Sequence, residues 1–145
     1  MEEFFMQRSQ KLVEEFRSFQ QWEDRYKKII QMGKNLPDLP EEFRQEKFLV
    51  KGCQSQVWLH AELDDEGKML LKADSDALIV KGLVAVLLQV YSGLTPKEVL
   101  ASSPQFMEDL GFKESLSPSR ANGFVSMIKQ IMLYAQAFSL TQASK

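Results

Sequence analysis

The chain has 145 residues, of which 44% are hydrophobic, and it carries a formal net charge of −2 at pH 7. This size and composition predict one globular domain spanning residues 1–145, with no room for a cofactor domain beside a substrate domain. Basic and acidic residues are divided evenly between residues 1–50 and 51–145, so the sequence lacks the basic footprint of a nucleic-acid-binding protein.

Two features of the sequence bear on where the protein works. Residues 1–5 contain two glutamates, whereas a secretory signal begins with basic residues, and the most apolar run, residues 77–91, is too short to span a bilayer. The single cysteine, Cys53, excludes an internal disulfide. We therefore expect a cytoplasmic protein with no membrane partner, in a reducing compartment where a free thiol persists.

The first part of the chain has helical spacing. Apolar residues recur at three- and four-residue steps and predict two amphipathic helices, the second ending near Gly33. These residues are Phe5, Leu12, Phe16 and Phe19, then Trp22, Tyr26, Ile29 and Ile30. The prolines within residues 36–40 predict an extended connection, and a short turn is expected at residues 41–44.

Strand character follows in the middle of the chain. Residues 56–63 alternate between apolar and polar side chains and predict a strand. Residues 64–67 predict a hairpin loop and residues 68–73 the returning strand. Residues 48–51 are a candidate third strand. The acidic hairpin loop lacks the spacing of a calcium site.

Helices return after residue 74. Asp74 and Asp76 offer side-chain acceptors at the start of a buried helix that runs to about Tyr91 and stops near Gly93. Thr95 and Glu98 have the spacing of a capping box.

Two further helices complete the predicted fold. Residues 104–110 predict a short helix that ends at Gly111, and Ser117 with Pro118 opens a long final helix. The order of elements predicts an α+β fold, with a small antiparallel sheet of about three strands covered by helices.

The residue types do not supply a metal, cofactor or acid–base site. One cysteine and one histidine cannot form the closed four-ligand zinc site, and the glycines are isolated rather than grouped in a phosphate-binding loop. A Cys–His hydrolase would have to use Cys53 and His60. On one extended segment these residues would lie roughly 20 Å apart, far beyond hydrogen-bond reach. We interpret His60 as a histidine on a sheet face.

Cys53 itself is the main candidate for chemistry. It lies between Gly52 and Gln54, where a polar loop enters the first clear strand. A lone cysteine is often a small buried hydrophobe, and this interpretation stays open. A thiol on a loop, with no second cysteine to resolve it, also suits sulfur exchange with another protein.

Three ordered blocks of residues resemble the SufE family of sulfur-acceptor proteins, which includes CsdE-like members. The blocks are Gly52-Cys53-Gln54-Ser55-Gln56-Val57-Trp58, then Asp74-Ser75-Asp76-Ala77 with Ile79-Val80-Lys81-Gly82-Leu83, and Leu116-Ser117-Pro118-Ser119-Arg120 with Gly123. Trp22-Glu23 with Tyr26, and Gly33 with Leu36-Pro37, also match. The resemblance covers roughly residues 22–135.

The resemblance implies a fold and a function. In this family, a pyridoxal-phosphate-dependent cysteine desulfurase of the SufS or CsdA type forms a persulfide on its own cysteine. The SufE-like protein accepts the terminal sulfur, here on Cys53, stimulates the desulfurase and relays the sulfur to an iron–sulfur scaffold complex of the SufBCD type. The pyridoxal phosphate is expected in the partner, with no cofactor in this chain. The implied fold resembles that of the iron–sulfur scaffold protein IscU.

The other matched residues have narrower expected roles. Those that should shape the Cys53 loop are Gly52, Gln54 and Ser55. Asp74 and Asp76 are interpreted as helix caps, with contact to the partner as the alternative. Arg120 lies at the start of the last helix, where the helix dipole disfavours a cation. The sequence leaves two interpretations of Arg120 open: contact with a carboxylate or the partner surface, and a solvated surface position.

Two hypotheses remain from the sequence. The first is a sulfur carrier and desulfurase activator without an independent catalytic site. The second is a non-catalytic adaptor domain whose Cys53 is inert packing. A weaker third possibility is a Cys-based hydrolase that uses His60.

Overall fold

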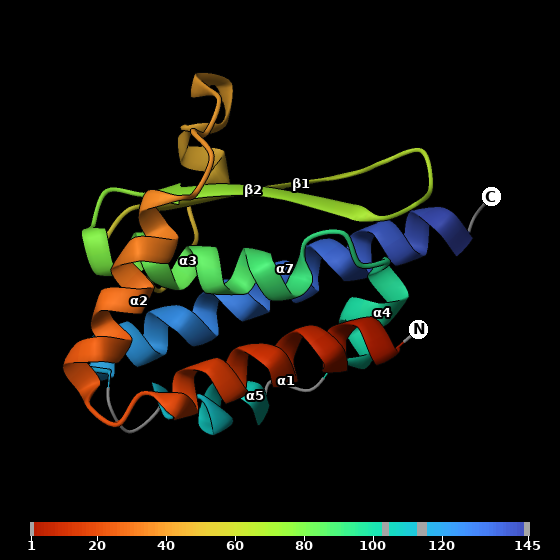
Figure 1. The fold of residues 1–145 in the computed structure, drawn as a ribbon. Coiled ribbons are helices and arrows are strands. Elements are labelled where there is room, and N and C mark those ends of the chain that lie inside the picture. Colours follow the sequence, from red (N-terminus) through yellow and green to blue (C-terminus); the bar gives the residue numbers. More distant parts are fainter. Residues whose placement is uncertain (1, 103–104, 113–115, 144–145) are drawn as a thin grey trace.

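A β-hairpin lies over a layer of helices in the computed structural model, which describes residues 2–102, 105–112 and 116–143 (Figure 1). The helices and strands, in chain order, are α1 (Glu2–Ser18), α2 (Trp22–Lys34), the 3₁₀ turns η1 (Glu41–Phe43) and η2 (Glu46–Phe48), β1 (Val57–Leu63), β2 (Met69–Ser75), α3 (Leu78–Tyr91), α4 (Pro96–Ala101), α5 (Gln105–Asp109) and α7 (Pro118–Ala143). This arrangement confirms the predicted α+β class.

The sheet has two strands in the part of the chain that the structure describes. β1 and β2 pair antiparallel, with Val57 opposite Ser75 and Leu63 opposite Met69. The predicted third strand at residues 48–51 is wrong, because that segment contributes only an isolated bridge between Leu49 and Trp58.

The two faces of the hairpin have different covers. Residues Val57, Leu59 and Ala61 of β1 are buried, and α3 and α7 lie below the hairpin (Figure 1). The segment that holds η1 and η2 lies above it, where the ring of His60 stacks on Phe43 at 3.8 Å between centroids. Successive side chains of β1 therefore point alternately to the helices and to the η1–η2 segment, as the alternating sequence predicts.

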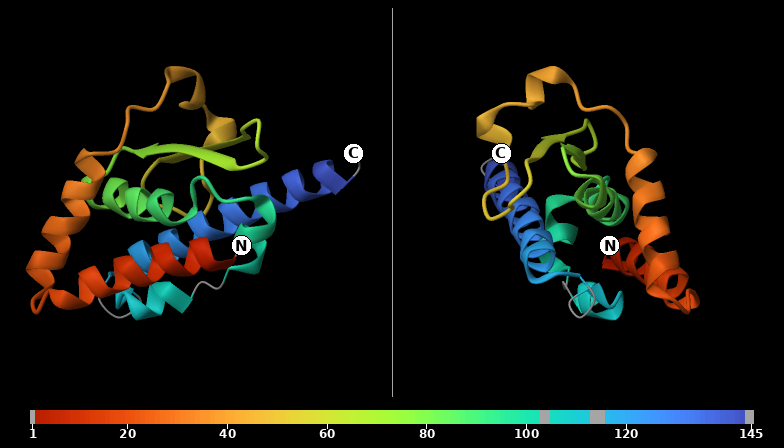
Figure 2. Two further views of the ribbon diagram at one scale, coloured as in Figure 1. Left: turned by 45° about the vertical axis from the view of Figure 1, so that its right-hand side comes forward. Right: turned by 90° about the vertical axis from the view of Figure 1, so that its left-hand side faces the viewer.

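Two glycines allow α2 and α3 to pack closely. A Cβ atom on Gly82 would lie 2.2 Å from the carbonyl oxygen of Ile29, and a Cβ atom on Gly33 would lie 2.8 Å from the backbone nitrogen of Gly82. Both distances are shorter than any real contact, so each position requires glycine. This close packing fixes the start of α3 against α2, which Figure 2 shows at one end of the molecule.

Aromatic side chains fill the core between the helices. Phe112 contacts Phe16 of α1 and Phe124 of α7, with ring centroids 5.6 and 5.4 Å apart. Phe106 of α5 contacts Phe124 and Phe5 at 6.4 and 5.8 Å. These contacts join α1, α5 and α7 in one apolar cluster, which positions the start of α7.

The predicted helix starts are partly confirmed. Thr95 and Glu98 form the capping box at α4, and Ser117 Oγ accepts a hydrogen bond from the Arg120 N–H in the first turn of α7. The predicted caps of α3 are wrong: its N-cap residue is Ala77, which has no side-chain hydrogen bond. The short helix predicted at residues 104–110 is α5, and Pro104 lies outside the described residues.

Candidate functional site

Cys53 lies on a loop of residues 51–56 whose ends are fixed by the hairpin. The N–H of Val50 donates to the carbonyl oxygen of Val57 at 2.8 Å. At the other end, the N–H of Gln56 donates to Asp76 Oδ1 at 3.0 Å, and the N–H of Asp76 donates to the carbonyl oxygen of Gln56 at 3.2 Å. Asp76 therefore anchors the loop of Cys53.

Gly52 lets this loop pack against α7. Its φ angle of +92° lies in the left-handed region, and a Cβ atom on Gly52 would lie 2.5 Å from the hydroxyl oxygen of Ser126. Both the backbone conformation and the close approach favour glycine. The expected role of Gly52 in shaping the loop has this physical basis.

The Cys53 thiol is partly buried against α7. Its Sγ donates a hydrogen bond to the carbonyl oxygen of Gly123 at 3.6 Å, and a Cβ atom on Gly123 would lie 3.5 Å from Sγ. Burial raises the pKa of the Cys53 thiol above its ordinary value of 9.0. The resting side chain is therefore a protonated thiol at neutral pH.

A cavity of about 460 Å³ opens beside the thiol. Its walls come from the Cys53 loop, the start of α3 and the start of α7. The lining residues are Cys53, Gln54, Ser55, Ala77, Leu78, Ile79, Val80, Leu83, Ser117, Ser119, Arg120, Gly123 and Met127. The α3 wall is apolar, whereas the opposite wall carries Ser119 and Arg120 of α7 and Ser117 just before it, so the thiol faces a cavity of mixed polarity.

The structure brings some of the sequence-derived site residues together at this cavity. Gln54, Ser55 and Arg120 line it with Cys53. The side chains of Gln54 and Arg120 are exposed, and that of Ser55 is partly buried. Their proposed roles in sulfur transfer remain predictions.

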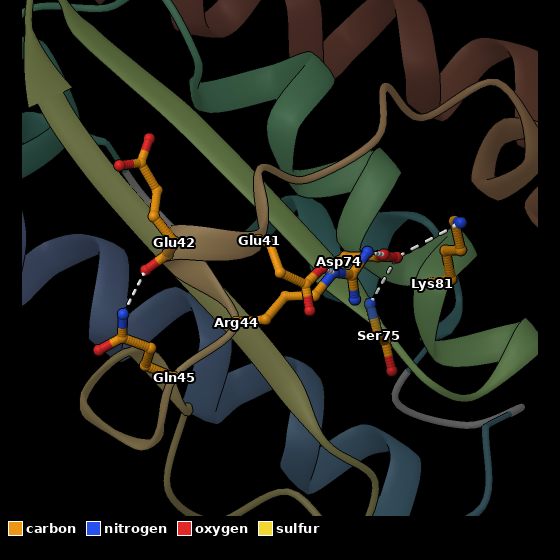
Figure 3. Close-up of polar contacts among 7 residues, drawn as sticks. All are labelled: Glu41, Glu42, Arg44, Gln45, Asp74, Ser75 and Lys81. Atoms are coloured by element: carbon orange, nitrogen blue, oxygen red, sulfur yellow. Dashed lines mark hydrogen bonds and ion pairs between the residues drawn. The ribbon is translucent and has the colours of Figure 1, made fainter.

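Asp74 does not line the cavity, and its carboxylate has other partners. Arg44, between η1 and η2, points at Asp74 and pairs with it, while Lys81 of α3 approaches to 3.4 Å (Figure 3). The carboxylate also accepts from the Ser75 N–H at 2.8 Å. The side chain of Asp74 is 7% exposed. Asp74 thus ties three segments together: the η1–η2 segment, β2 and α3.

These partners lower the pKa of Asp74. Burial alone would raise it, but the hydrogen bonds from Arg44 and Ser75 and the charges of Lys81 and Arg44 outweigh burial. The pKa of this carboxyl therefore lies below its ordinary value of 3.8. Arg44 was not identified from the sequence, because a residue 30 positions from its partner leaves no local pattern.

His60 is not part of the cavity. Its ring stacks on Phe43 and meets Phe48 edge-on, on the face of β1 away from the buried residues, and among the described residues its buried Nδ1 atom has no hydrogen-bond partner. Burial lowers the pKa of His60. The sequence therefore placed His60 correctly on a sheet face, and the cavity lining contains no histidine beside Cys53.

Gly123 and Met127 complete the cavity but were not predicted as lining residues. A glycine inside a helical pattern often marks a close approach, and this signal was available at Gly123. Met127 carries no comparable signal, since it matches the apolar stripe of any buried helix.

Two observations concern metals and membranes. Among the described residues, no three histidine, cysteine, aspartate or glutamate side chains lie close enough to hold a metal ion. None of the helices in the same ranges has the length and apolar character needed to cross a membrane.

The fold and the site thus define a helix-covered hairpin protein with one cysteine at a cavity. Residues 10–135 match the SufE family, described as an Fe-S metabolism associated domain. An uncharacterized SufE-like protein of Synechocystis sp. (strain ATCC 27184 / PCC 6803 / Kazusa) is 44% identical over 133 residues, which cover 92% of this chain and 83% of that protein. The chain belongs to the SufE family, and this membership associates it with iron–sulfur metabolism.

A solved structure shares the fold. The solution structure of a hypothetical protein from Thermus thermophilus is similar to this chain, with a TM-score of 0.77 and 23% sequence identity. The similarity covers 92% of this chain and 96% of that chain. At this identity the similarity concerns the fold alone.

Proposed function

We propose that this chain is the sulfur acceptor and activator of a pyridoxal-phosphate-dependent cysteine desulfurase in the cytoplasm. Cys53 takes sulfane sulfur as a persulfide and relays it to an iron–sulfur scaffold complex. The observation that carries this proposal is the position of the only cysteine: Cys53 lies on an anchored loop at a cavity of about 460 Å³. Family membership supplies the metabolic context.

The transfer step is a thiol–persulfide exchange, which requires no added oxidant or reductant. The Cys53 thiolate attacks the outer sulfur of the partner's persulfide and forms a new sulfur–sulfur bond. The original sulfur–sulfur bond breaks, and the partner's cysteine leaves as a thiolate with the electron pair. Because the chain has one cysteine, no internal disulfide can discharge the persulfide, so the sulfur must pass to an external acceptor, which in this proposal is the scaffold complex.

The surroundings of Cys53 favour holding a second sulfur atom. A sulfur–sulfur bond is about 2.05 Å long, and Gly123 has no side chain to occupy the space beside Sγ. The apolar residues of α3 form one wall of the cavity. Limited access to solvent slows oxidation of the sulfur.

The raised pKa of Cys53 sets a condition for the reaction. Burial keeps the thiol protonated, so the attack requires exposure of the loop or a base from the partner. An open loop would return the thiol pKa toward its ordinary value. In this proposal, binding of the partner supplies one of these two conditions.

The test is mass mapping of the Cys53 peptide after incubation with a cysteine desulfurase and free cysteine. We expect one added sulfur atom that a reductant removes. Cys53→Ser should carry no added sulfur and should lose the stimulation of the desulfurase. Lys11→Ala, an exposed change on α1, is the control and should behave as the parent.

The opposite result would support the adaptor hypothesis. If Cys53→Ser stimulates the desulfurase as well as the parent and no added sulfur is trapped, the carrier function is wrong. In that case Cys53 is packing between its loop and α7.

A further inference from the structure

A second hollow, which we call the basic groove, runs along α7 beside the Cys53 loop. Its volume is about 400 Å³. The lining residues are Lys47, Phe48, Leu49, Lys51, Ser126, Lys129, Gln130, Leu133 and Tyr134. These residues come from η2, from the segment that leads into the Cys53 loop, and from α7.

The charge of this groove is entirely positive. Lys47, Lys51 and Lys129 are exposed, and the lining contains no aspartate or glutamate. Among the described residues, none of these three lysines has a carboxylate within 4.0 Å. The whole of α7, Pro118–Ala143, also lacks acidic residues. In a chain with a net charge of −2, this cluster is a local concentration of unpaired cations.

Several other lysines of the chain are in ion pairs, whereas the exposed Lys11, Lys27 and Lys97 lie on three separate helices rather than around one hollow. Lys28 pairs with Glu15 at 2.7 Å, and Lys68 pairs with Glu66 at 3.2 Å. Unpaired cations around one hollow attract an anionic partner and speed its association.

The walls of the basic groove add an apolar component. Leu133 is 58% exposed, and the Lys47 ammonium lies 5.1 Å from the centre of the Phe48 ring. The Tyr134 hydroxyl donates to the carbonyl oxygen of Leu59 at 2.8 Å, which fixes its ring on β1. Exposed leucine beside aromatic rings fits an apolar side chain better than a free inorganic anion.

The basic groove is adjacent to Cys53. Lys51 precedes Gly52 in the loop, and Ser126 lines the groove while packing against Gly52. Gly123, which accepts the hydrogen bond from Cys53, lies one helical turn before Ser126 and Met127 on α7. An occupant of the groove would contact the same loop and helix that hold the thiol.

We propose that the basic groove binds an acidic segment with an apolar side chain, presented by the desulfurase from which Cys53 takes sulfur. The identity of that protein rests on the function proposed above, whereas the chemistry of the segment rests on the groove. A nucleic acid is less suited, because the cationic surface is limited to one hollow on an acidic protein.

The direct test is a titration of the full chain with a short synthetic peptide of glutamate, aspartate and leucine, followed by amide NMR. We expect shifts confined to the groove residues, and binding that weakens as salt is raised. The K47E/K51E/K129E variant should bind roughly tenfold more weakly. The K47Q/K51Q/K129Q variant is a milder change that keeps the test valid if K47E/K51E/K129E misfolds. It should also bind more weakly than the parent.

Matched controls separate the groove from net charge. The K11E/K27E/K97E variant changes the charge equally at exposed lysines of α1, α2 and α4, and should bind as the parent does. A peptide with glutamine and asparagine in place of the acids should not bind. Equal binding by parent and K47E/K51E/K129E would overturn the proposal, as would tighter binding of a single-stranded oligonucleotide that competes with the peptide.

A second measurement links the groove to sulfur exchange. K47E/K51E/K129E should load Cys53 from the desulfurase more slowly than the parent, whereas K11E/K27E/K97E should load as the parent does, and raised salt should slow the parent toward the rate of K47E/K51E/K129E. Equal loading from the desulfurase would overturn the proposal. If the desulfurase fails to load even the parent, the proposed function is wrong. The peptide titration still tests separately whether the groove binds an acidic segment.

Discussion

The Sγ atom of Cys53 lies 3.6 Å from the carbonyl oxygen of Gly123. Two distant segments therefore meet at one sulfur atom, the loop after Val50 and the first turns of α7. The carbonyl accepts the thiol proton, and the absence of a side chain at Gly123 leaves open space beside Sγ. A protonated, hydrogen-bonded thiol becomes a nucleophile only once its proton is removed.

The ionisation of Cys53 is the first testable consequence. Its alkylation by iodoacetamide should be slower at pH 7 than that of free cysteine, because only the thiolate reacts and burial raises the thiol pKa above 9.0. The rate should rise with pH to a midpoint above 9.0. The same chain unfolded in urea is the control and should react with an ordinary midpoint. A midpoint in the folded chain below that of the unfolded chain would contradict the prediction.

The ion pair of Arg44 with Asp74 should make stability depend on acid pH. Arg44→Met removes one partner of a carboxylate whose side chain is 7% exposed, so the free energy of unfolding should fall by about 1–3 kcal/mol at pH 7. The pKa of Asp74 is lower in the folded chain than its ordinary 3.8. The stabilisation is therefore complete above that ordinary value and is lost as pH falls through the folded pKa.

Urea denaturation of parent and Arg44→Met from pH 7 to pH 2.5 measures this effect. The difference between the two proteins should shrink at the acid end, as Asp74 becomes protonated. Lys68→Met removes an exposed pair with Glu66 and should change stability by less than about 1 kcal/mol. A difference that stays constant with pH would show that Arg44 acts through packing on Trp58, which its guanidinium covers at 5.2 Å.

The hairpin and most helices could be predicted because their signals are local. Alternation in β1 and the capping box at α4 each involve residues close in sequence. The third strand failed for a tertiary reason: Phe48 belongs to η2 and packs against the His60 ring at 5.3 Å, so the segment does not extend along β1. Side-chain packing outweighed the apolar composition of residues 48–51.

The site was only partly predictable, because its contacts also depend on tertiary packing. The loop position of Cys53 follows from its polar neighbours, but its contact with Gly123 depends on how α7 crosses the loop. Asp74 and Asp76 were misassigned as caps because β2 runs on to Ser75, which puts the start of α3 at Leu78. The two carboxylates then bond to Arg44 and to Gln56 instead.

Glycine at the α2–α3 contact should be far more important for stability than glycine at the thiol. A Cβ atom on Gly82 would meet the backbone of Ile29 at 2.2 Å, so Gly82→Ala should cost at least about 2 kcal/mol. A Cβ atom on Gly123 would make an ordinary contact at 3.5 Å, and alanine favours a helix interior by about 1 kcal/mol. Thermal unfolding should show a lower Tm for Gly82→Ala and an equal or higher Tm for Gly123→Ala. The reverse order would contradict the packing described for these helices.

Asp76 should control how firmly the Cys53 loop is held. Asp76→Ala removes the acceptor for the Gln56 N–H at 3.0 Å, a hydrogen bond worth about 1 kcal/mol, so the loop should open roughly fivefold more often. Hydrogen exchange at Gln56 and alkylation of Cys53 should both become faster. Asp76→Asn keeps an acceptor oxygen and is the matched control, while Asp65→Ala changes an exposed acid in the hairpin loop. If alkylation of Cys53 is unchanged in Asp76→Ala, Asp76 does not control access to the thiol. The loop is then held by the Val50–Val57 hydrogen bond and by packing on α7.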